Sequence, residues 1–347
     1  MGGRESCFTS RIHKVEEKNT ISALNIIGID VSKDKLDVCL LRPNGKQIDK
    51  IFDNTSAGHK KLLRWATHLT GEEARHFALE ATGSYGTACA THLSEQSERV
   101  SVLNPARVKA YGIALGVLNK TDRADARLIA RFCKAEPPEL WRLATPEARL
   151  LTALVRRREQ IVEQRTAERN RSKQPGLPKE VHRSHEQTIR FLEKQIGEIE
   201  KSISEHIDKH PTLQADHKLL VSIPGVADTL SSVLLAELPT LSECTNSAAI
   251  GSYAGLSPRE HRSGSSVQQR THISKSGNAA LRRALYMPTL SAIRCNPLVK
   301  ALYDRLVGRG MCPKAALCAA MRKLLMIAVG ILKNRTKFDA DFILKPA

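Results

Sequence analysis

Short apolar runs alternate with amphipathic segments over the first third of the chain. Asn44-Gly45 is a hairpin signal between two of these runs. Strands are predicted at residues 25–31, 36–41, 46–52, 76–81 and 99–103, and helices at 57–70, 85–97 and from Pro105 onward. The order β-β-β-α-β-α-β-α predicts a ribonuclease-H-like (RuvC-like) α/β domain, with the first strand central and the fourth beside it.

Helical periodicity dominates the rest of the chain. Pro137-Pro138 marks a linker, because proline is excluded from a helix interior. Apolar positions at helical spacing predict a long helix at 146–171 and a heptad-like helix at 187–207, with a break at 172–185. The two helices form either an intramolecular hairpin or a coiled-coil arm that joins two subunits, and the pattern leaves both open.

A helix-hairpin-helix-like element is predicted at residues 219–238, where Ile223-Pro224-Gly225-Val226 separates two apolar segments. The backbone of such a turn, Gly225 included, can hold a phosphate, although an ordinary helix–helix turn gives the same pattern. The predicted organisation combines an α/β part with a mostly α part. It comprises a tail at 1–23, the RuvC-like domain at 24–135, the arm at 145–208, a helical C-terminal domain at 215–337 and a tail at 338–347.

The formal net charge of +18 favours a polyanionic partner. Aromatic residues make up only 4% of the chain, which argues against base stacking as the main mode of binding. Residues 1–24 lack the apolar segment of a signal peptide, and no run of 18 or more apolar residues appears. We therefore expect a cytoplasmic protein, associated with the nucleoid if its source is a prokaryote, that binds nucleic acid and no membrane.

Four carboxylates are the first chemical candidate. Asp30 and Glu80 each lie at the edge of a predicted strand, and Asp122 and Asp125 lie one turn apart on a predicted helix. If the four converge, they can bind a divalent metal and support phosphodiester chemistry.

Each carboxylate also has a simpler interpretation. Asp34 and Asp37 stand close to Asp30 and compete with it, although Asp34 lies in a charged turn. Asp122 could be only the N-cap of its helix, a position for which Thr121 competes.

A basic loop is the second candidate. Residues 255–337 hold sixteen Lys and Arg against Glu260 and Asp304. Within them, the Ser263-Gly264 turn lies among arginines, where a serine could attack a phosphodiester, although a non-catalytic phosphate-binding loop has the same composition. The candidate nucleic-acid contacts are Lys120, Arg123, Gly225, Arg259, Arg262, Arg270, Lys275, Arg282 and Arg283.

The chain contains, in this order, the motifs GIDVSKDKLDV, ALEATGSYG, LNPARVKAYG, KTDRADARLIA, SIPGVADTLSSVLLAEL, SYAGLSPREHRSG and HISKSGNAALRRALY. Together they resemble the IS110 (insertion-sequence 110) family of DEDD transposases over residues 24–335. The resemblance implies a RuvC-like catalytic domain, a second catalytic domain that contains a serine, and recombination of DNA element ends with a target. It also implies guidance by a non-coding bridge RNA and assembly into a homo-oligomer, a dimer or a tetramer.

The resemblance further implies roles for particular residues. The metal-binding set falls on Asp30, Glu80, Asp122 and Asp125, which would hold one or two Mg²⁺ ions. The serine that becomes linked to DNA falls on Ser263, with Ser265 and Ser266 as competitors. Many relatives have a glycine where this chain has Val267-Gln268-Gln269, a difference that bears on the conformation of the loop. The serine domain would have to reach the carboxylates of the same or another subunit.

Two other functions fit the same residues. One is a metal-dependent, structure-specific nuclease of the Holliday-junction-resolvase type, without a covalent serine step. The other is a nucleic-acid-binding protein without catalysis, against which the presence of all four carboxylates in so basic a chain argues.

Overall fold

The computed structural model describes residues 24–81, 85–116, 121–241, 246–259, 262–263, 267–268 and 272–340. The chain divides into two compact units, Met1–Leu143 and Ala144–Ala347. The predicted tail at 1–23 lies outside the described residues. The finer division of the second unit into an arm and a C-terminal domain stays a prediction.

The first unit is built on a mixed five-stranded sheet in the order β3-β2-β1-β4-β5. Its strands are β1 (Asn25–Val31), β2 (Lys35–Leu41), β3 (Gln47–Asp53), β4 (Arg75–Glu80) and β5 (Arg99–Leu103). The pairs β1–β2 and β2–β3 are antiparallel, whereas β1–β4 and β4–β5 are parallel. The prediction of a central first strand with the fourth beside it is confirmed, and the sheet is consistent with a ribonuclease-H-like domain.

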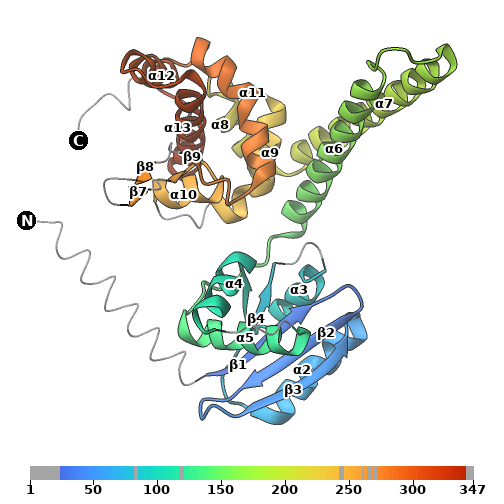
Figure 1. Cartoon of the computed structure of the whole chain (residues 1–347), viewed down its shortest axis with the longest axis vertical. Coiled ribbons are helices and arrows are strands. Elements are labelled where there is room, and N and C mark those ends of the chain that lie inside the picture. The colour runs from blue at the N-terminus through green and yellow to red at the C-terminus, as the bar shows by residue number, and fades with distance from the viewer. Residues whose placement is uncertain are drawn as a thin grey trace, which may run out of the picture. The chain divides into compact units, whose positions relative to one another are not determined.

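Helices cover both faces of this sheet (Figure 1). They are α2 (Ser56–Thr70), α3 (Thr87–Glu95), α4 (Pro105–Ala114) and α5 (Asp122–Ala135). Because side chains alternate along a strand, Ile27 and Ile29 of β1 pack with α2 and α3, whereas Ile26 packs with α4 and α5. Apolar side chains of β1 therefore point to both faces of the sheet, and the strand is buried on both sides.

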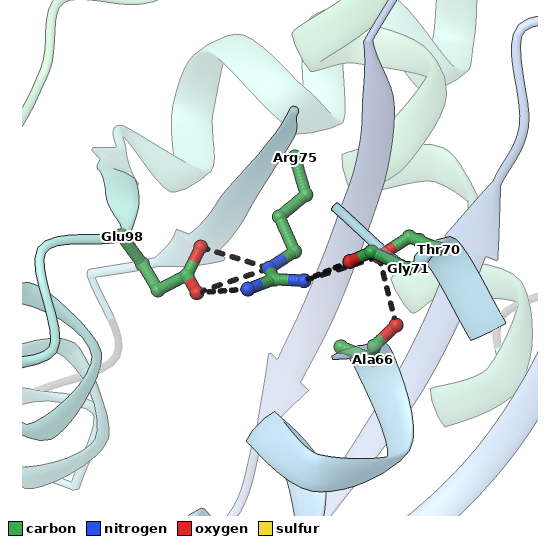
Figure 2. A network of polar contacts seen from close by, with 5 residues as sticks. All are labelled: Ala66, Thr70, Gly71, Arg75 and Glu98. Atoms are coloured by element: carbon green, nitrogen blue, oxygen red, sulfur yellow. Dashed lines mark hydrogen bonds and ion pairs between the residues drawn. The ribbon is translucent and has the colours of Figure 1, made fainter. Parts of the chain in front are cut away.

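An arginine ties the amino-terminal end of β4 to its surroundings (Figure 2). Arg75 donates through Nε and Nη2 to Glu98, at 2.7–3.0 Å, and through Nη1 to Thr70 and Gly71 at the end of α2. Both side chains of the pair are largely buried, which makes the bidentate geometry more stabilising than an exposed ion pair. The network holds the end of β4 opposite to Glu80.

The second unit begins with a helical hairpin of α6 (Pro146–Arg171) and α7 (Lys179–Lys209) (Figure 1). Ile161, Leu192 and Ile196 form a small core between the two helices, and Arg158–Glu200 and Arg169–Glu193 pair across them. The predicted break at 172–185 is too long, because α7 already begins at Lys179 after Pro178. The intramolecular hairpin is thus present, and a role in joining subunits stays a prediction.

Among the described residues, six further helices form the body of the second unit (Figure 1). They are α8 (Pro211–Val221), α9 (Asp228–Leu241), α10 (Ser247–Tyr253), α11 (Ala279–Cys295), α12 (Pro297–Gly308) and α13 (Pro313–Asn334). By length and composition α13 could span a membrane, but 61% of its most apolar window is buried inside this body. It is the core helix of the unit.

Candidate active site

Three strand carboxylates share one face of the sheet. Asp30 follows Ile26 and Gly28 at alternate positions of β1, and these residues face α5. Asp37 of β2 is the direct partner of Asp30 in the antiparallel register. Ile29 of β1 and Leu79 of β4 are partners in the parallel register, so the next residue of β4, Glu80, lies beside Asp30 at the end of the strand. The side chain of Glu80 is on the same face of the sheet as that of Ala78, which packs with α5.

Helix α5 crosses this face at very close range. A Cβ built on Gly28 would lie 2.3 Å from the carbonyl oxygen of Ala126 and 2.5 Å from the nitrogen of Ala130, so only glycine permits the approach. Arg127 of α5 forms a bidentate pair with Asp49 of β3, which fixes the helix to the sheet. The first turn of α5, with Asp122 and Asp125, is thereby brought to the end of β1.

Thr121 caps this helix, since its hydroxyl accepts a hydrogen bond from the Ala124 amide at 3.2 Å. The interpretation of Asp122 as the cap is therefore wrong. Asp122 and Asp125 instead place negative charge in the first turn, where the helix dipole favours it.

The carboxylates interact electrostatically. Burial, followed by the negative charges of Asp125, Asp122 and Asp37 in that order, raises the pKa of Asp30 to about 6. An opposing contribution comes from the Val31 amide, which donates to the Asp30 carboxylate. Repulsion among these groups identifies a concentration of negative charge that a cation would relieve.

Lys35, the first residue of β2, lies among these carboxylates. Its Nζ donates to Asp122 Oδ2 at 2.6 Å and lies 3.1 Å from Asp37 Oδ2. The hydrogen bond to Asp122, followed by the one to Asp37, raises the pKa of Lys35, so the ammonium stays charged. Sequence reasoning missed Lys35 and named Asp37 only as a competitor of Asp30. The signal for Asp37 was a charged residue inside the otherwise apolar strand LDVCLL.

The donor set fits a hard divalent cation, because carboxylate oxygens are the ligands that such ions prefer. As they stand, no three His, Cys, Asp or Glu side chains in the described ranges lie close enough to hold a metal ion. The carboxylates therefore interact electrostatically, but their oxygens are not arranged around one point where a metal ion could bind. Binding an ion requires their side chains to rearrange.

The predicted serine loop is a nested pair of short hairpins in the second unit. Strand β6 (Pro258–Arg259) pairs with β9 (His272–Ile273), and β7 (Arg262–Ser263) pairs with β8 (Val267–Gln268). Ser263 thus ends β7, directly before residues 264–266, where the competitors Ser265 and Ser266 lie outside the described residues.

Tyr253 anchors the base of this loop. The Asn278 amide donates to the Tyr253 carbonyl at 2.6 Å, and the Asn278 side chain donates to the Tyr253 hydroxyl, which itself donates to Glu237. A Cβ on Gly277 would meet the same carbonyl at 2.4 Å. The two ends of the loop are therefore held together by one residue that sequence reasoning did not identify.

The candidate nucleic-acid contacts lie in different environments. Arg123, Arg259 and Lys275 are exposed, and Nε of Arg123 lies 3.8 Å from Oδ2 of Asp49. Arg282 donates to the Ala254 carbonyl, and Arg283 pairs with Glu163 of α6 at 2.5 Å. Arg262 lies in β7, and Lys120 and Arg270 lie outside the described residues.

The helix-hairpin-helix-like element is the pair α8–α9. Gly225 has φ +95°, and a Cβ there would lie 2.7–2.9 Å from Ala292 of α11. Asn296 donates to the Pro224 carbonyl at 3.3 Å, so the turn is held against α11. The positive φ and the close packing against α11 therefore explain the need for glycine at position 225, and phosphate binding at the turn stays a prediction.

Comparison with known proteins covers both units. Residues 27–175 match the IS110 DEDD family described as "Transposase", and residues 217–304 match "Transposase IS116/IS110/IS902 family". The chain is 33% identical over 315 residues to a pilin gene-inverting protein of Moraxella bovis, covering 90% of this chain and 97% of the relative. It is 26% identical over 227 residues to a transposase for insertion sequence element IS1328 of Yersinia enterocolitica, covering 56% of this chain and 64% of the relative.

Proposed function

The chain belongs to the IS110 family of transposases and is a DNA transposase or recombinase, and we propose that it cuts and rejoins DNA with metal-bound carboxylates and a serine nucleophile. The carboxylates are those of Asp30, Glu80, Asp122 and Asp125, and the nucleophile is Ser263. The observation that carries the proposal is the convergence of β1, β4 and the first turn of α5 on one sheet end.

The four carboxylates would hold one or two Mg²⁺ ions, which when bound polarise the scissile phosphate and make the nucleophile easier to deprotonate. The family itself suggests use of a divalent metal. Burial and then the charges of the neighbouring carboxylates raise the pKa of Asp30, which supports this assignment, since a bound cation would remove the repulsion among the carboxylates.

Ser263 performs the covalent step. Its hydroxyl loses a proton, and Oγ bonds to phosphorus as the bond from phosphorus to the 3′ oxygen breaks and that oxygen takes up a proton. The phosphoserine ester preserves the energy of the broken bond. A 3′ hydroxyl from another strand can then attack the ester, release Ser263 and rejoin the DNA without a nucleotide cofactor.

The partners follow from the charge and from the family. A net charge of +18 supports binding of DNA, at the element ends and the target, and of a non-coding bridge RNA whose base pairing supplies the sequence readout. The α6–α7 hairpin would contribute to a dimer or tetramer. The Moraxella bovis relative is named as a gene-inverting protein. The same strand exchange in this chain would invert a DNA segment if the two recombination sites on one molecule were in opposite orientations.

A covalent-adduct assay tests the mechanism. Wild-type protein, bridge RNA and element DNA should give a protein–DNA adduct that survives denaturant, and both Asp30→Asn and Ser263→Ala should abolish it. Ser276→Ala is the matched control, because Ser276 is exposed in the same loop and its hydroxyl donates to the Ser274 carbonyl.

Each contrary result has a definite meaning. Loss of the adduct in Ser265→Ala or Ser266→Ala with retention in Ser263→Ala moves the nucleophile to that residue. Metal-dependent cleavage of branched DNA without any adduct favours the structure-specific nuclease and contradicts the serine step. Unchanged recombination by Asp30→Asn contradicts the carboxylate assignment.

A further inference from the structure

Lys35 forms ion pairs with two carboxylates at the sheet end that carries the candidate site. Its ammonium bridges Asp37 of β2 and Asp122 of α5, at 3.1 and 2.6 Å from their Oδ2 atoms. Asp37 is almost buried, whereas the side chains of Lys35 and Asp122 are 44% and 57% exposed. The ammonium of Lys35 can leave the group by rotation about its long flexible stem, while the backbone stays fixed at the start of β2.

The arginines near the site face another carboxylate. Arg127 forms its bidentate pair with Asp49, and Arg123 also faces Asp49. Lys33, in the turn between β1 and β2, is exposed and has no ion pair among the contacts of the described residues. Lys35 is thus the basic side chain that offsets the negative charge around Asp30.

The same contact accounts for the open arrangement of the carboxylates. An ammonium 2.6 Å from Asp122 Oδ2 takes the space and the oxygen lone pair that a metal ion would use, and it repels a cation at short range. The absence of a closed group of ligands among the described side chains agrees with an Asp122 that is turned toward Lys35.

We propose that Lys35 is an internal counter-ion that competes with the divalent ion for Asp122 and leaves when the ion binds. The inference rests on the proposed metal role of Asp122. Its consequence is a weak intrinsic affinity for metal, because each binding event must break the Lys35–Asp122 pair. The displaced ammonium remains within one side-chain length of the site.

Calorimetric titration of the full chain with Mn²⁺, without nucleic acid, tests the proposal. Lys35→Met should bind Mn²⁺ more tightly than wild type, by roughly threefold to tenfold, as expected for loss of one partly exposed competing ion pair. Lys35→Arg keeps the charge and should remain near wild type, and Lys33→Met is the matched neighbour that should leave the Kd unchanged. Circular dichroism verifies that the variants are folded.

Three outcomes with the lysine variants overturn the inference. An unchanged Kd in Lys35→Met shows that there is no competition, and a weaker Kd shows that Lys35 helps to hold Asp122 for the metal. An equal gain in Lys33→Met shows only a general effect of net charge. The metal assignment is tested separately by Asp122→Asn: if that variant binds Mn²⁺ as wild type does, the assignment of Asp122 fails, and the inference fails with it.

Discussion

Asp30 and Asp37 are direct cross-strand partners on β1 and β2, so their side chains emerge on the same face of the sheet. Like charges in this position repel, and Asp37 contributes to the raised pKa of Asp30. Lys35 offsets part of that repulsion. A fifth carboxylate therefore belongs to the environment of the four that the sequence identified.

Asp37→Asn should slow recombination by about 10-fold to 100-fold, the range found when a residue that supports metal ligands is changed. The substitution preserves shape while removing the charge that faces Asp30 and Lys35. Asp34→Asn is the control, because Asp34 is exposed in the preceding turn. Recombination rates on element DNA measure the effect, and equal rates for the two variants would contradict it.

Gly28→Ala should destabilise the first unit by about 1–3 kcal/mol, because the added methyl group overlaps the backbone of α5 at Ala126 and Ala130. Recombination should fall as well, since α5 carries Asp122 and Asp125. Urea unfolding measures the stability. Gly86→Ala serves for comparison, because its Cβ would have ordinary contacts of 3.6–3.9 Å and should leave the unfolding free energy nearly unchanged.

His76 should make the first unit sensitive to acid. Burial, with a smaller contribution from the positive charge of Arg99, lowers the pKa of this histidine from 6.5 to about 4. Its Nε2 donates to Ser101 Oγ, since the Ser101 proton goes to the Glu139 carbonyl, and the lowered pKa keeps the ring neutral near pH 7.

The unfolded chain binds a proton at His76 below about pH 6.5, whereas the folded chain does so only below about pH 4. Stability from this residue is therefore complete above pH 6.5 and is lost as the pH falls to about 4, by roughly 3 kcal/mol. Unfolding free energies of wild type and His76→Gln should converge over that interval. The exposed His68, changed to Gln, should leave the pH dependence as it is.

Tyr253→Phe should reduce the yield of covalent adduct while leaving DNA affinity within about twofold, because it releases the base of the Ser263 loop without removing a cation. The hydroxyl it deletes bonds both Glu237 and Asn278. Adduct yield and DNA affinity are measured on the same preparations. Tyr286→Phe, at an exposed position of α11, is the control. A parallel loss of DNA binding in Tyr253→Phe would assign the residue to the binding surface instead.

Local patterns were sufficient for most of the fold. Apolar runs bounded by turn residues predicted β1, β2, β4 and β5 to within a residue, because buried strands have nearly continuous apolar runs. The Asn44-Gly45 turn predicted β3 equally well, although its side chains are mostly exposed. Helical spacing likewise predicted α6 at its observed bounds. The break before α7 was overestimated, because its polar first turns carry no apolar periodicity and their helical state depends on packing against α6.

The sequence by itself determined which carboxylates and which serine are candidates, through their residue types, their strand and helix positions and the motifs around them. Tertiary structure alone decided that Asp37 and Lys35 join the carboxylates, that Thr121 rather than Asp122 caps α5, and that Tyr253 closes the serine loop. Register, the Gly28 approach and side-chain pairing are relations between residues far apart in the chain, as in the approach of Gly28 to Ala130, 102 positions later. Such relations cannot be predicted from local composition, because they arise only when the sheet and its helices pack.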